Sequence, residues 1–347
     1  MNPTQPKRKP GLTQAADVYQ QMNMMVTSHW VPQAIRAAVD LSLPDHLAGE
    51  GLTADEVARR ENSAPGTTFR LMRACVVLGL LTADTEGRFH STPLLETLRK
   101  GTPRSLRGLA LATTLPAQWL AWNQFTASVR AGRTQAAIAL GADFFEYLET
   151  HPSEAHDFSE GLSSTTSLWT SDAAKVIDTT GVNLVVDVGG ANGSLLYLLL
   201  EGNPSLRGIV FDRPNVIAGA AAEAARKGLT ERAEVVGGDF FQCVPSADLY
   251  LLKMILHDWD DTSCIKLLTN CREAMMPRGR IAVVEMIIGP LSDPGPAALM
   301  DMNMLAAVPG QERSLMEYDA LLSASGLRRT AVLPTSSVQS VIEAVAA

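Results

Sequence analysis

The chain has 347 residues, of which 46% are hydrophobic and 19% charged, a composition typical of a globular protein with room for two domains. Its formal net charge of −8 argues against a broad nucleic-acid-binding surface, because such surfaces usually carry clustered Lys and Arg. The four cysteines lack the paired spacing of a zinc or redox site, and no apolar stretch approaches the roughly 20 residues that span a bilayer. Since the polar start also lacks a signal-peptide core, we expect a cytoplasmic protein without nucleic-acid or membrane partners.

Residues 1–15 precede the first helical pattern. They hold the only locally basic run, Lys7, Arg8 and Lys9. Short polar termini of this kind are usually solvated. We expect a flexible tail with no function of its own.

The first domain is predicted over residues 16–105, where apolar residues three or four apart indicate helices. Thr53 opens a capping box with Glu56, which predicts a helix from about Ala54. The segment GLLTADTEGRFHST then predicts a short hairpin that turns at Glu86 and Gly87. Two helices followed by a hairpin form a winged-helix pattern, and the acidic balance favours dimerisation over DNA binding as its role.

Residues 106–175 keep a helical pattern that is rich in aromatic residues. Such residues usually pack in a core, although some could line an apolar pocket shared with the next domain. We expect a helical connector that contributes to a substrate pocket. The aromatic residues are Trp119, Trp122, Phe125, Phe144, Phe145, Tyr147, Phe158 and Trp169.

Residues 176–347 alternate short apolar runs with helical patterns, which predicts a parallel sheet covered on both faces. The expected fold class is α/β, with a C-terminal, doubly wound, Rossmann-like domain behind the N-terminal, mostly helical domain. The apolar runs are LVVDV, RGIVFD, AEVVGGDF, DLYLLKMIL and RIAVVEMII.

Ligands bind such sheets beyond the carboxyl ends of the strands. A glycine turn with Gly189 follows the first strand, but it fails the dinucleotide fingerprint because Ala191 and Ser194 replace two of its glycines. Asp212 ends the second strand, about 20 residues beyond the glycine turn, where a carboxylate can accept both hydroxyls of a ribose. After the fourth strand, His257 lies between an apolar run and a group of acids.

These residues carry a resemblance to a known family. The chain resembles the S-adenosylmethionine-dependent small-molecule O-methyltransferases of the plant caffeate type and their bacterial antibiotic-biosynthesis relatives. The similar segments are LVVDVGGANGS, FDRP, GGDFF, LLKMILHDWDD, PRGRIAVVEMII and PGQERS. The resemblance covers nearly the whole chain, because those enzymes also carry an N-terminal winged-helix dimerisation domain. It implies a homodimer formed through that domain, with S-adenosylmethionine as the methyl donor.

The resemblance also implies a cofactor site. Gly189 would approach the methionine moiety and Asp212 would bind the ribose. Asp239 and Phe240 would hold the adenine, by a hydrogen bond and by covering its face, and Lys253 would be a further contact. Plant members commonly have methionine in place of Phe240, and both side chains can cover a ring.

His257 matches the general base of the family, and Glu285 and Glu312 match the two acids that flank and orient it. Methyl transfer to oxygen needs close positioning of two reactants and removal of the acceptor proton. An unperturbed histidine, with a pKa of about 6.5, is mostly neutral in the cytosol and can accept that proton. A carboxylate on its other nitrogen would fix the tautomer.

One segment, MDMNMLAAVPGQERS, departs from the plant pattern. Ala307 and Val308 stand where plant phenol enzymes usually have histidine and asparagine, which suggests a more apolar acceptor pocket. The candidate acceptor contacts are Met300, Asn303 and Met304, although helical core packing explains the methionines equally well. We expect the acceptor to be an aromatic secondary metabolite, a polyketide or a phenazine-like phenol.

The residues leave other functions open. A relative of this family could catalyse hydroxylation, decarboxylation or ring closure in place of methyl transfer. A winged helix could serve a DNA-binding regulator that senses a small molecule, and the incomplete glycine fingerprint leaves an NAD-dependent dehydrogenase as a weaker alternative. A metal-assisted methyltransferase would need ligands such as Asp258, Asp260 and Asp261, which more simply belong to a loop and a helix N-cap. We expect no metal ion.

Overall fold

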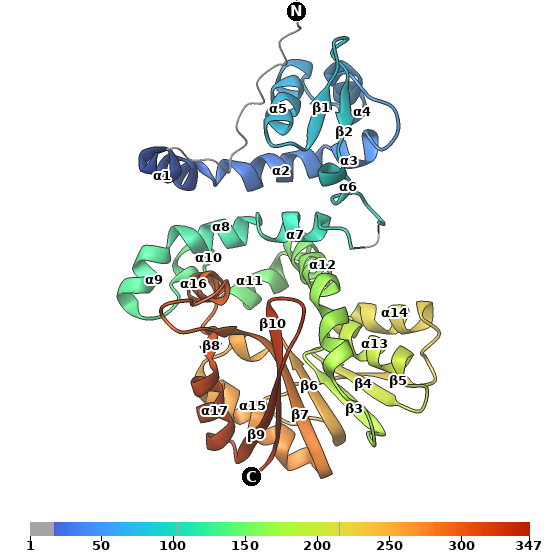
Figure 1. The fold of residues 1–347 in the computed structure, drawn as a ribbon, viewed down its shortest axis with the longest axis vertical. Coiled ribbons are helices and arrows are strands. Elements are labelled where there is room, and N and C mark those ends of the chain that lie inside the picture. Colours follow the sequence, from blue (N-terminus) through green and yellow to red (C-terminus); the bar gives the residue numbers. More distant parts are fainter. Residues whose placement is uncertain (1–16, 103, 215) are drawn as a thin grey trace, which may run out of the picture. The chain divides into compact units, whose positions relative to one another are not determined.

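The computed structural model describes residues 17–102, 104–214 and 216–347, without the side chains of residues 162–168 and 218. The flexible tail expected over residues 1–15 lies outside the described residues. The chain divides into two compact units, the first ending at Thr114 and the second running from Leu115 to Ala347 (Figure 1). Residues 106–114, which we assigned to the connector, therefore group with the first unit.

The first unit has the expected order of helices followed by a hairpin. The side chain of Thr53 accepts from the N–H of Glu56, and the Glu56 carboxylate accepts from the N–H of Thr53, so the capping box is confirmed. The hairpin pairs two antiparallel strands, and Gly87 in its turn has φ of +79°. The elements are α1 (Val18–Thr27), α2 (Trp30–Asp40), α3 (Leu43–His46), α4 (Ala54–Glu61), α5 (Pro65–Val77), β1 (Leu81–Ala83), β2 (Phe89–Ser91), α6 (Pro93–Glu96) and α7 (Arg107–Ala112).

The second unit is built on a twisted sheet in the order β5-β4-β3-β6-β7-β10-β9. The first five strands in that order are parallel, and β10 runs antiparallel to both of its neighbours. The order reverses at β3, between β4 and β6, which is the switch point expected of a doubly wound fold. The strands are β3 (Leu184–Val188), β4 (Arg207–Asp212), β5 (Ala233–Gly237), β6 (Ala247–Lys253), β7 (Met275–Ile288), β8 (Arg313–Ser314, paired with β7), β9 (Leu327–Pro334) and β10 (Gln339–Ala346).

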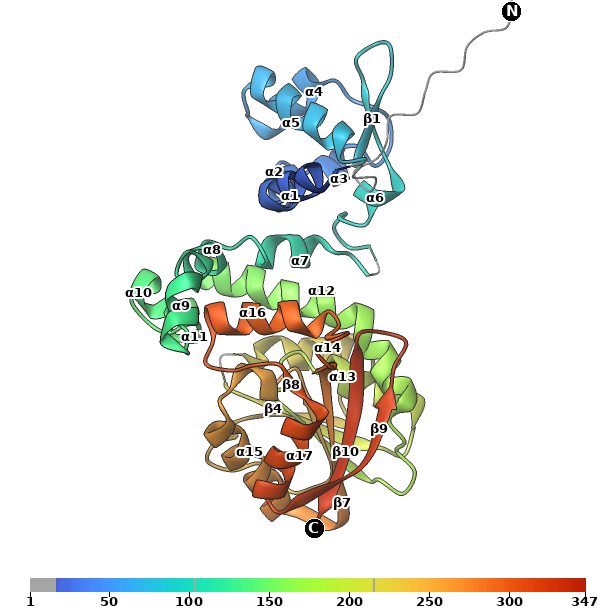
Figure 2. The same ribbon diagram turned by 60° about the vertical axis from the view of Figure 1, so that its left-hand side comes forward.

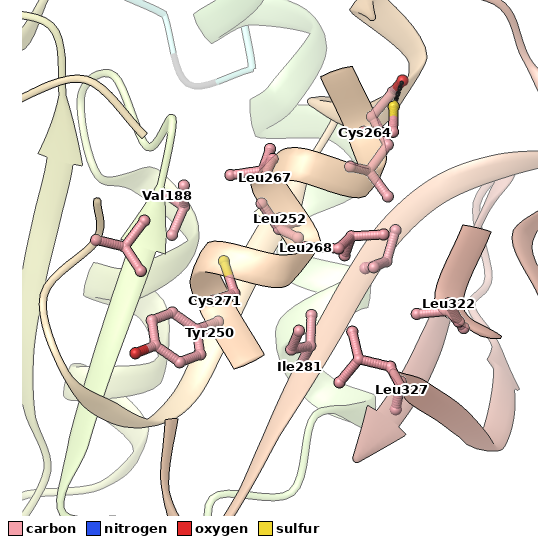
Figure 3. Packing of buried hydrophobic residues seen from close by; sticks show 14 of the residues in the cluster. Val188, Tyr250, Leu252, Cys264, Leu267, Leu268, Cys271, Ile281, Leu322 and Leu327 are labelled. Carbon is pink, nitrogen blue, oxygen red and sulfur yellow. Dashed lines mark hydrogen bonds between the residues drawn. The ribbon is translucent and has the colours of Figure 1, made fainter. Parts of the chain in front are cut away.

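Helices cover both faces of this sheet, which confirms the predicted fold class (Figure 1). One face packs against α12 (Pro152–Val176), α13 (Ser194–Gly202) and α14 (Ala220–Arg226), and the short 3-10 helix η1 (Ile217–Gly219) precedes α14. The other face packs against α15 (Asp261–Ala274) and α17 (Leu315–Ala324), which follow the 3-10 helix η2 (Leu256–Asp258) and β8. Figure 3 shows part of this second core, in which Leu267, Leu268 and Cys271 of α15 lie over Tyr250 and Ile281 of the sheet.

A third group of helices packs with α16 (Ala297–Ala307) (Figure 2). These helices are α8 (Pro116–Asn123), α9 (Phe125–Ala131), α10 (Ala136–Leu140) and α11 (Phe144–Thr150). Phe144 and Leu148 of α11 share one buried apolar cluster with Met304 and Ala307 of α16. Among the described residues, no helix combines the length and the apolarity that crossing a membrane requires.

Candidate active site

The glycine turn after β3 packs directly against the loop that carries His257. Gly189 has φ of +70°, and its N–H donates to the carbonyl oxygen of Phe211 at 2.8 Å. A Cβ at position 189 would overlap the Ile255 side chain, two residues before His257. The positive φ favours glycine at this position, and a side chain there would also displace Ile255.

Asp212, at the end of β4, is buried and faces the same turn. Its Oδ2 accepts from the N–H of Ala191 at 3.0 Å, and its Oδ1 accepts from the N–H of Arg213 at 2.7 Å. Burial raises the pKa of Asp212, and these two backbone bonds lower it. Each carboxylate oxygen can accept a second hydrogen bond, so both remain able to receive a hydroxyl.

Asp239 and Phe240 follow β5 at the same edge of the sheet. Asp239 is exposed, and its Oδ1 accepts from the N–H of Phe241 at 2.8 Å. Phe240 is 9% exposed and meets the ring of Trp259 edge to face, with centroids 6.1 Å apart. Trp259 thus joins the candidate adenine contact to the His257 loop.

Lys253 ends β6 beside an acid that our reading of the sequence did not single out. Burial lowers the pKa of Lys253, and the charges of Asp187 and Glu285 raise it. Asp187 is 3% exposed on the adjacent strand β3, and burial raises its pKa to about 7. A Cβ at Gly190 would lie 2.7 Å from the Asp187 carboxyl carbon, so the Asp187 side chain lies directly against the glycine turn.

The turn from β6 into η2 positions His257. Met254 has φ of +56°, a left-handed conformation that non-glycine residues rarely adopt and that is often found at functional sites. Glu285 on β7 holds the loop: its Oε1 accepts from the N–H groups of Ile255 at 3.0 Å and Leu256 at 2.9 Å. These two hydrogen bonds orient the main chain that carries His257. Glu285 itself is fully buried.

The imidazole of His257 is 5% exposed, and its Nδ1 lies 2.7 Å from Oε1 of Glu312. In the neutral ring this geometry assigns the proton to Nδ1, which donates to the carboxylate and leaves Nε2 as the acceptor. The Glu285 Oε2 lies 3.9 Å from Nδ1, and the Asp258 Oδ1 lies 3.5 Å from Nε2. The structure thus brings all three predicted catalytic residues together.

Gly310 and Arg313 in the segment PGQERS lock the His257 loop, and our reading of the sequence assigned them no role. A Cβ at Gly310 would overlap the main chain of His257 and Asp258. The guanidinium of Arg313 is fully buried and donates to the carbonyl oxygens of Leu256 and Trp259, both at 2.8 Å. It also donates to the Asp261 carboxylate at 2.8 Å. The sequence signal was the unusual placement of a glycine and an arginine on either side of Glu312.

The charges around His257 differ from the sequence expectation. Burial opposes the charged form of its ring, but three carboxylates outweigh this effect and raise the pKa of His257 to about 10. The contributing carboxylates, in order of effect, belong to Glu285, Asp258 and Glu312. The mostly neutral imidazole expected from an unperturbed pKa is therefore wrong for the ligand-free protein, because the sequence does not reveal how many acids surround the ring.

The candidate acceptor contacts all lie on α16. Met304 is 7% exposed and belongs to the apolar cluster with α11, and Met300 packs partly against it. The Oδ1 of Asn303 accepts from the indole N–H of Trp122 on α8 at 3.0 Å. Ala307 and Val308, the departure from the plant pattern, are both buried in the same cluster.

A metal site needs several ligand atoms close together, and the described residues contain one such group. Its atoms belong to His257, Glu285 and Glu312 and lie within 4.8 Å of one another. The close contact between His257 and Glu312 is a hydrogen bond, and one Glu285 oxygen is held by main-chain N–H groups. These partners favour an acid–base role for the group. Asp260, one of the acids weighed as a metal ligand, caps α15 by accepting from the N–H of Ser263 at 2.8 Å.

Comparison with known families identifies both parts of the chain. Residues 122–328 match the O-methyltransferase domain, and residues 24–101 match the O-methyltransferase dimerisation domain. The chain belongs to the O-methyltransferase family. The enzyme class and the two-domain organisation implied by the resemblance are thereby confirmed for this O-methyltransferase.

The individual relatives agree with this O-methyltransferase assignment. The chain is 34% identical to the phenazine O-methyltransferase PhzM of Lysobacter antibioticus over 321 residues, 92% of this chain and 94% of the relative. It is similar to the crystal structure of LaPhzM, with a TM-score of 0.92 and 33% identity over 96% of this chain and 100% of that one. It is also similar to NcsB1 from neocarzinostatin biosynthesis, solved with S-adenosylmethionine and 2-hydroxy-5-methyl naphthoic acid (TM-score 0.79, 33% identity, 91% and 96% covered).

Proposed function

We propose that this O-methyltransferase transfers a methyl group from S-adenosylmethionine to a hydroxyl of an aromatic secondary metabolite, a polyketide or a phenazine-like phenol. His257 is the general base. The observation that carries the proposal is the 2.7 Å contact between His257 Nδ1 and Glu312, which makes Nε2 the nitrogen that accepts a proton when the ring is neutral. The phenazine and naphthoate relatives support an aromatic acceptor.

When bound, S-adenosylmethionine supplies an electrophilic methyl group, and its transfer to the acceptor oxygen leaves S-adenosylhomocysteine. His257 Nε2 takes the hydroxyl proton as the oxygen bonds to the methyl carbon, and the charge that develops on the ring is stabilised by Glu312. Glu285 holds the loop main chain so that the ring does not reorganise during the step. The proton then passes from the imidazole to solvent.

The residues at the edge of the sheet fit the donor. Gly189 turns the chain with a positive φ directly after β3, and without a side chain its main chain can approach a ligand closely. Asp212 has two oxygens with spare acceptor capacity for the ribose hydroxyls. Asp239 and Phe240 follow β5, the neighbour of β4, and Lys253 ends β6, the neighbour of β3. We assign these five residues to the cofactor.

We assign Met300, Asn303 and Met304 to the acceptor, together with the aromatic residues of the helical connector. Their support is the apolar cluster in which α16 meets α11, because a flat aromatic ring gains most of its affinity from contact with such surfaces.

A direct assay tests this function. The protein is incubated with methyl-labelled S-adenosylmethionine and a panel of phenazine, naphthoate and polyketide phenols, and the products are identified by mass spectrometry. We expect a gain of one methyl group on oxygen, unchanged by a metal chelator. A product that carries no label but is hydroxylated, decarboxylated or cyclised would show that the enzyme catalyses the alternative chemistry and not methyl transfer.

The charges at His257 predict the pH dependence. The ring must be neutral to accept a proton, and its pKa is raised, so it is protonated at low pH and the rate increases with pH. With S-adenosylmethionine saturating, we expect kcat to increase from about pH 7 to about pH 10, because the three carboxylates raise the pKa of His257 to about 10. A pH–rate profile with NMR titration of the ring checks this. A rate that stays constant over that range would contradict it.

We propose a homodimer formed through the first unit. Six apolar side chains on α1 and at the start of α2 are between 58% and 80% exposed, an unusual surface for an isolated domain. They are Val18, Tyr19, Met22, Met25, Val26 and Trp30. The match to the O-methyltransferase dimerisation domain, which includes part of this surface, supports a second copy as its partner.

Charging this surface should separate the dimer. We expect the double variant Met22→Asp, Met25→Asp to elute as a monomer of about 37.2 kDa, and the unmodified protein to have twice that mass, by light scattering after gel filtration. The control Leu291→Asp places a charge at a fully exposed leucine of the second unit and should leave the dimer intact. If the double variant keeps the dimer mass, the interface lies elsewhere.

A further inference from the structure

We propose that Asp301 is a positioning residue that ties α16 to the acid that orients His257. This inference rests on the proposed function. Asp301 lies in the first half of α16, and its Oδ1 accepts from the main-chain N–H of Glu312 at 3.0 Å. The side chain of Glu312 in turn contacts Nδ1 of His257 at 2.7 Å. Two consecutive hydrogen bonds therefore join the helix to the base.

The position of Glu312 depends on its main chain. Its side chain is fully buried, and only Oε1 has a hydrogen-bond partner among the described protein atoms, namely His257. Oε2 has none. Because the carboxylate has no second hydrogen bond to a described residue, a shift of the Glu312 backbone moves it relative to the imidazole. Asp301 bonds that backbone through the one donor it offers.

Other contacts also support this segment. Gly310 lies against the main chain of the His257 loop, and Arg313 donates to the carbonyl oxygens of that loop. Both fix the segment to the loop that carries the base. Asp301 connects the segment to α16, in which Met300 directly precedes it and Asn303 follows two residues later.

The consequence is that the acceptor-contacting helix and the catalytic acid move together. A displacement of α16 by an acceptor would pass through the carboxylate of Asp301 to Glu312 and then to the ring of His257. An acceptor that holds α16 in its catalytic position would direct Nε2 of His257 toward the hydroxyl. An acceptor that displaces α16 would turn Nε2 away from it. This coupling makes turnover, more than binding, sensitive to the fit of the acceptor.

Charged and titratable groups act on both ends of this connection. Asp301 faces Glu312, Glu317 and Arg313, and burial raises its pKa. The ring of His257 faces Glu285, Asp258 and Glu312. Tyr318 of α17 and Cys264 of α15 lie within electrostatic range of this acidic group. The test must therefore separate the hydrogen bond of Asp301 from its charge.

Two variants make that separation. Asp301→Ala removes both the bond and the charge, and Asp301→Asn removes the charge but keeps an oxygen that can accept from Glu312. We expect Asp301→Ala to lower kcat by about tenfold with unchanged affinity for S-adenosylmethionine, and Asp301→Asn to keep kcat within about twofold. The hydrogen bond that His257 donates to Glu312 helps to raise the pKa of His257, so loosening it in Asp301→Ala should also move the acid limb of the kcat profile to lower pH.

Asp248→Ala is the matched control. The Asp248 carboxylate also accepts main-chain N–H bonds, from Asn183 at 2.9 Å and Leu184 at 3.0 Å. These bonds lie at the amino ends of β3 and β6, whereas His257 follows the carboxyl end of β6. The variant Asp248→Ala should lower the melting temperature and leave kcat and its pH profile unchanged.

Three results would overturn the inference: unchanged kcat in Asp301→Ala, an equal loss in Asp301→Asn, or the same kinetic change in Asp248→Ala. The variant His257→Ala, measured in the same assay, distinguishes failure of the inference from failure of the proposed function. If His257→Ala is inactive and Asp301→Ala is fully active, only the inference fails. If His257→Ala keeps its turnover, the proposed function fails first.

Discussion

His257→Ala lowers kcat by about 100-fold or more while S-adenosylmethionine still binds. The loss follows from the geometry, because the imidazole is the group at this edge whose Nε2 can take the acceptor proton once Nδ1 is held by Glu312. Binding is retained because Gly189, Asp212 and Asp239 lie at the ends of other strands and keep their own hydrogen bonds. Steady-state kinetics and calorimetric titration with S-adenosylhomocysteine measure the two quantities separately.

A second histidine provides a matched control. His90 also pairs with a carboxylate, Asp84, at 2.8 Å, but in the hairpin of the first unit. His90→Ala removes a comparable pair and should leave turnover unchanged. Full activity of His257→Ala would show that proton removal is performed by another group or by solvent.

Gly310→Ala is expected to be nearly as damaging, although it adds only a methyl group. A Cβ at this position would lie 2.5 Å from the main-chain nitrogen of Trp259 and would overlap the main chain of His257 and Asp258. The overlapped atoms are backbone atoms, which cannot rotate away as a side chain can. The loop must shift, at a cost of about 1–3 kcal/mol in the free energy of unfolding.

That shift also displaces the base from Glu312, so we expect a decrease in kcat of at least about tenfold. Chemical denaturation and kinetics of the same preparation measure both effects. Gly202→Ala is the control, because no atom lies within 4 Å of its added Cβ and its φ is not positive. If Gly310→Ala is as stable and active as Gly202→Ala, the close approach at position 310 is not required.

The strands and the edge where they end follow from local patterns. Apolar runs separated by amphipathic helices require a sheet with two covered faces, so the order of elements was predictable without knowledge of any contact. Helix starts were equally local, as at Ala54, since a capping box uses groups only three residues apart. Local patterns place helices less well where propensity is weaker, as before β5, where the short η1 precedes α14.

The sequence by itself thus determined the fold class, the family and a set of residues at the carboxyl ends of the strands. It could not decide how these residues act on one another, because Glu285, Glu312 and His257 come from three segments whose distances depend on packing. Only the tertiary structure placed three acids around the ring and raised its pKa. It alone also decided that Asp301, Gly310 and Arg313 hold the base, since main-chain contacts between distant segments leave almost no signal in residue type.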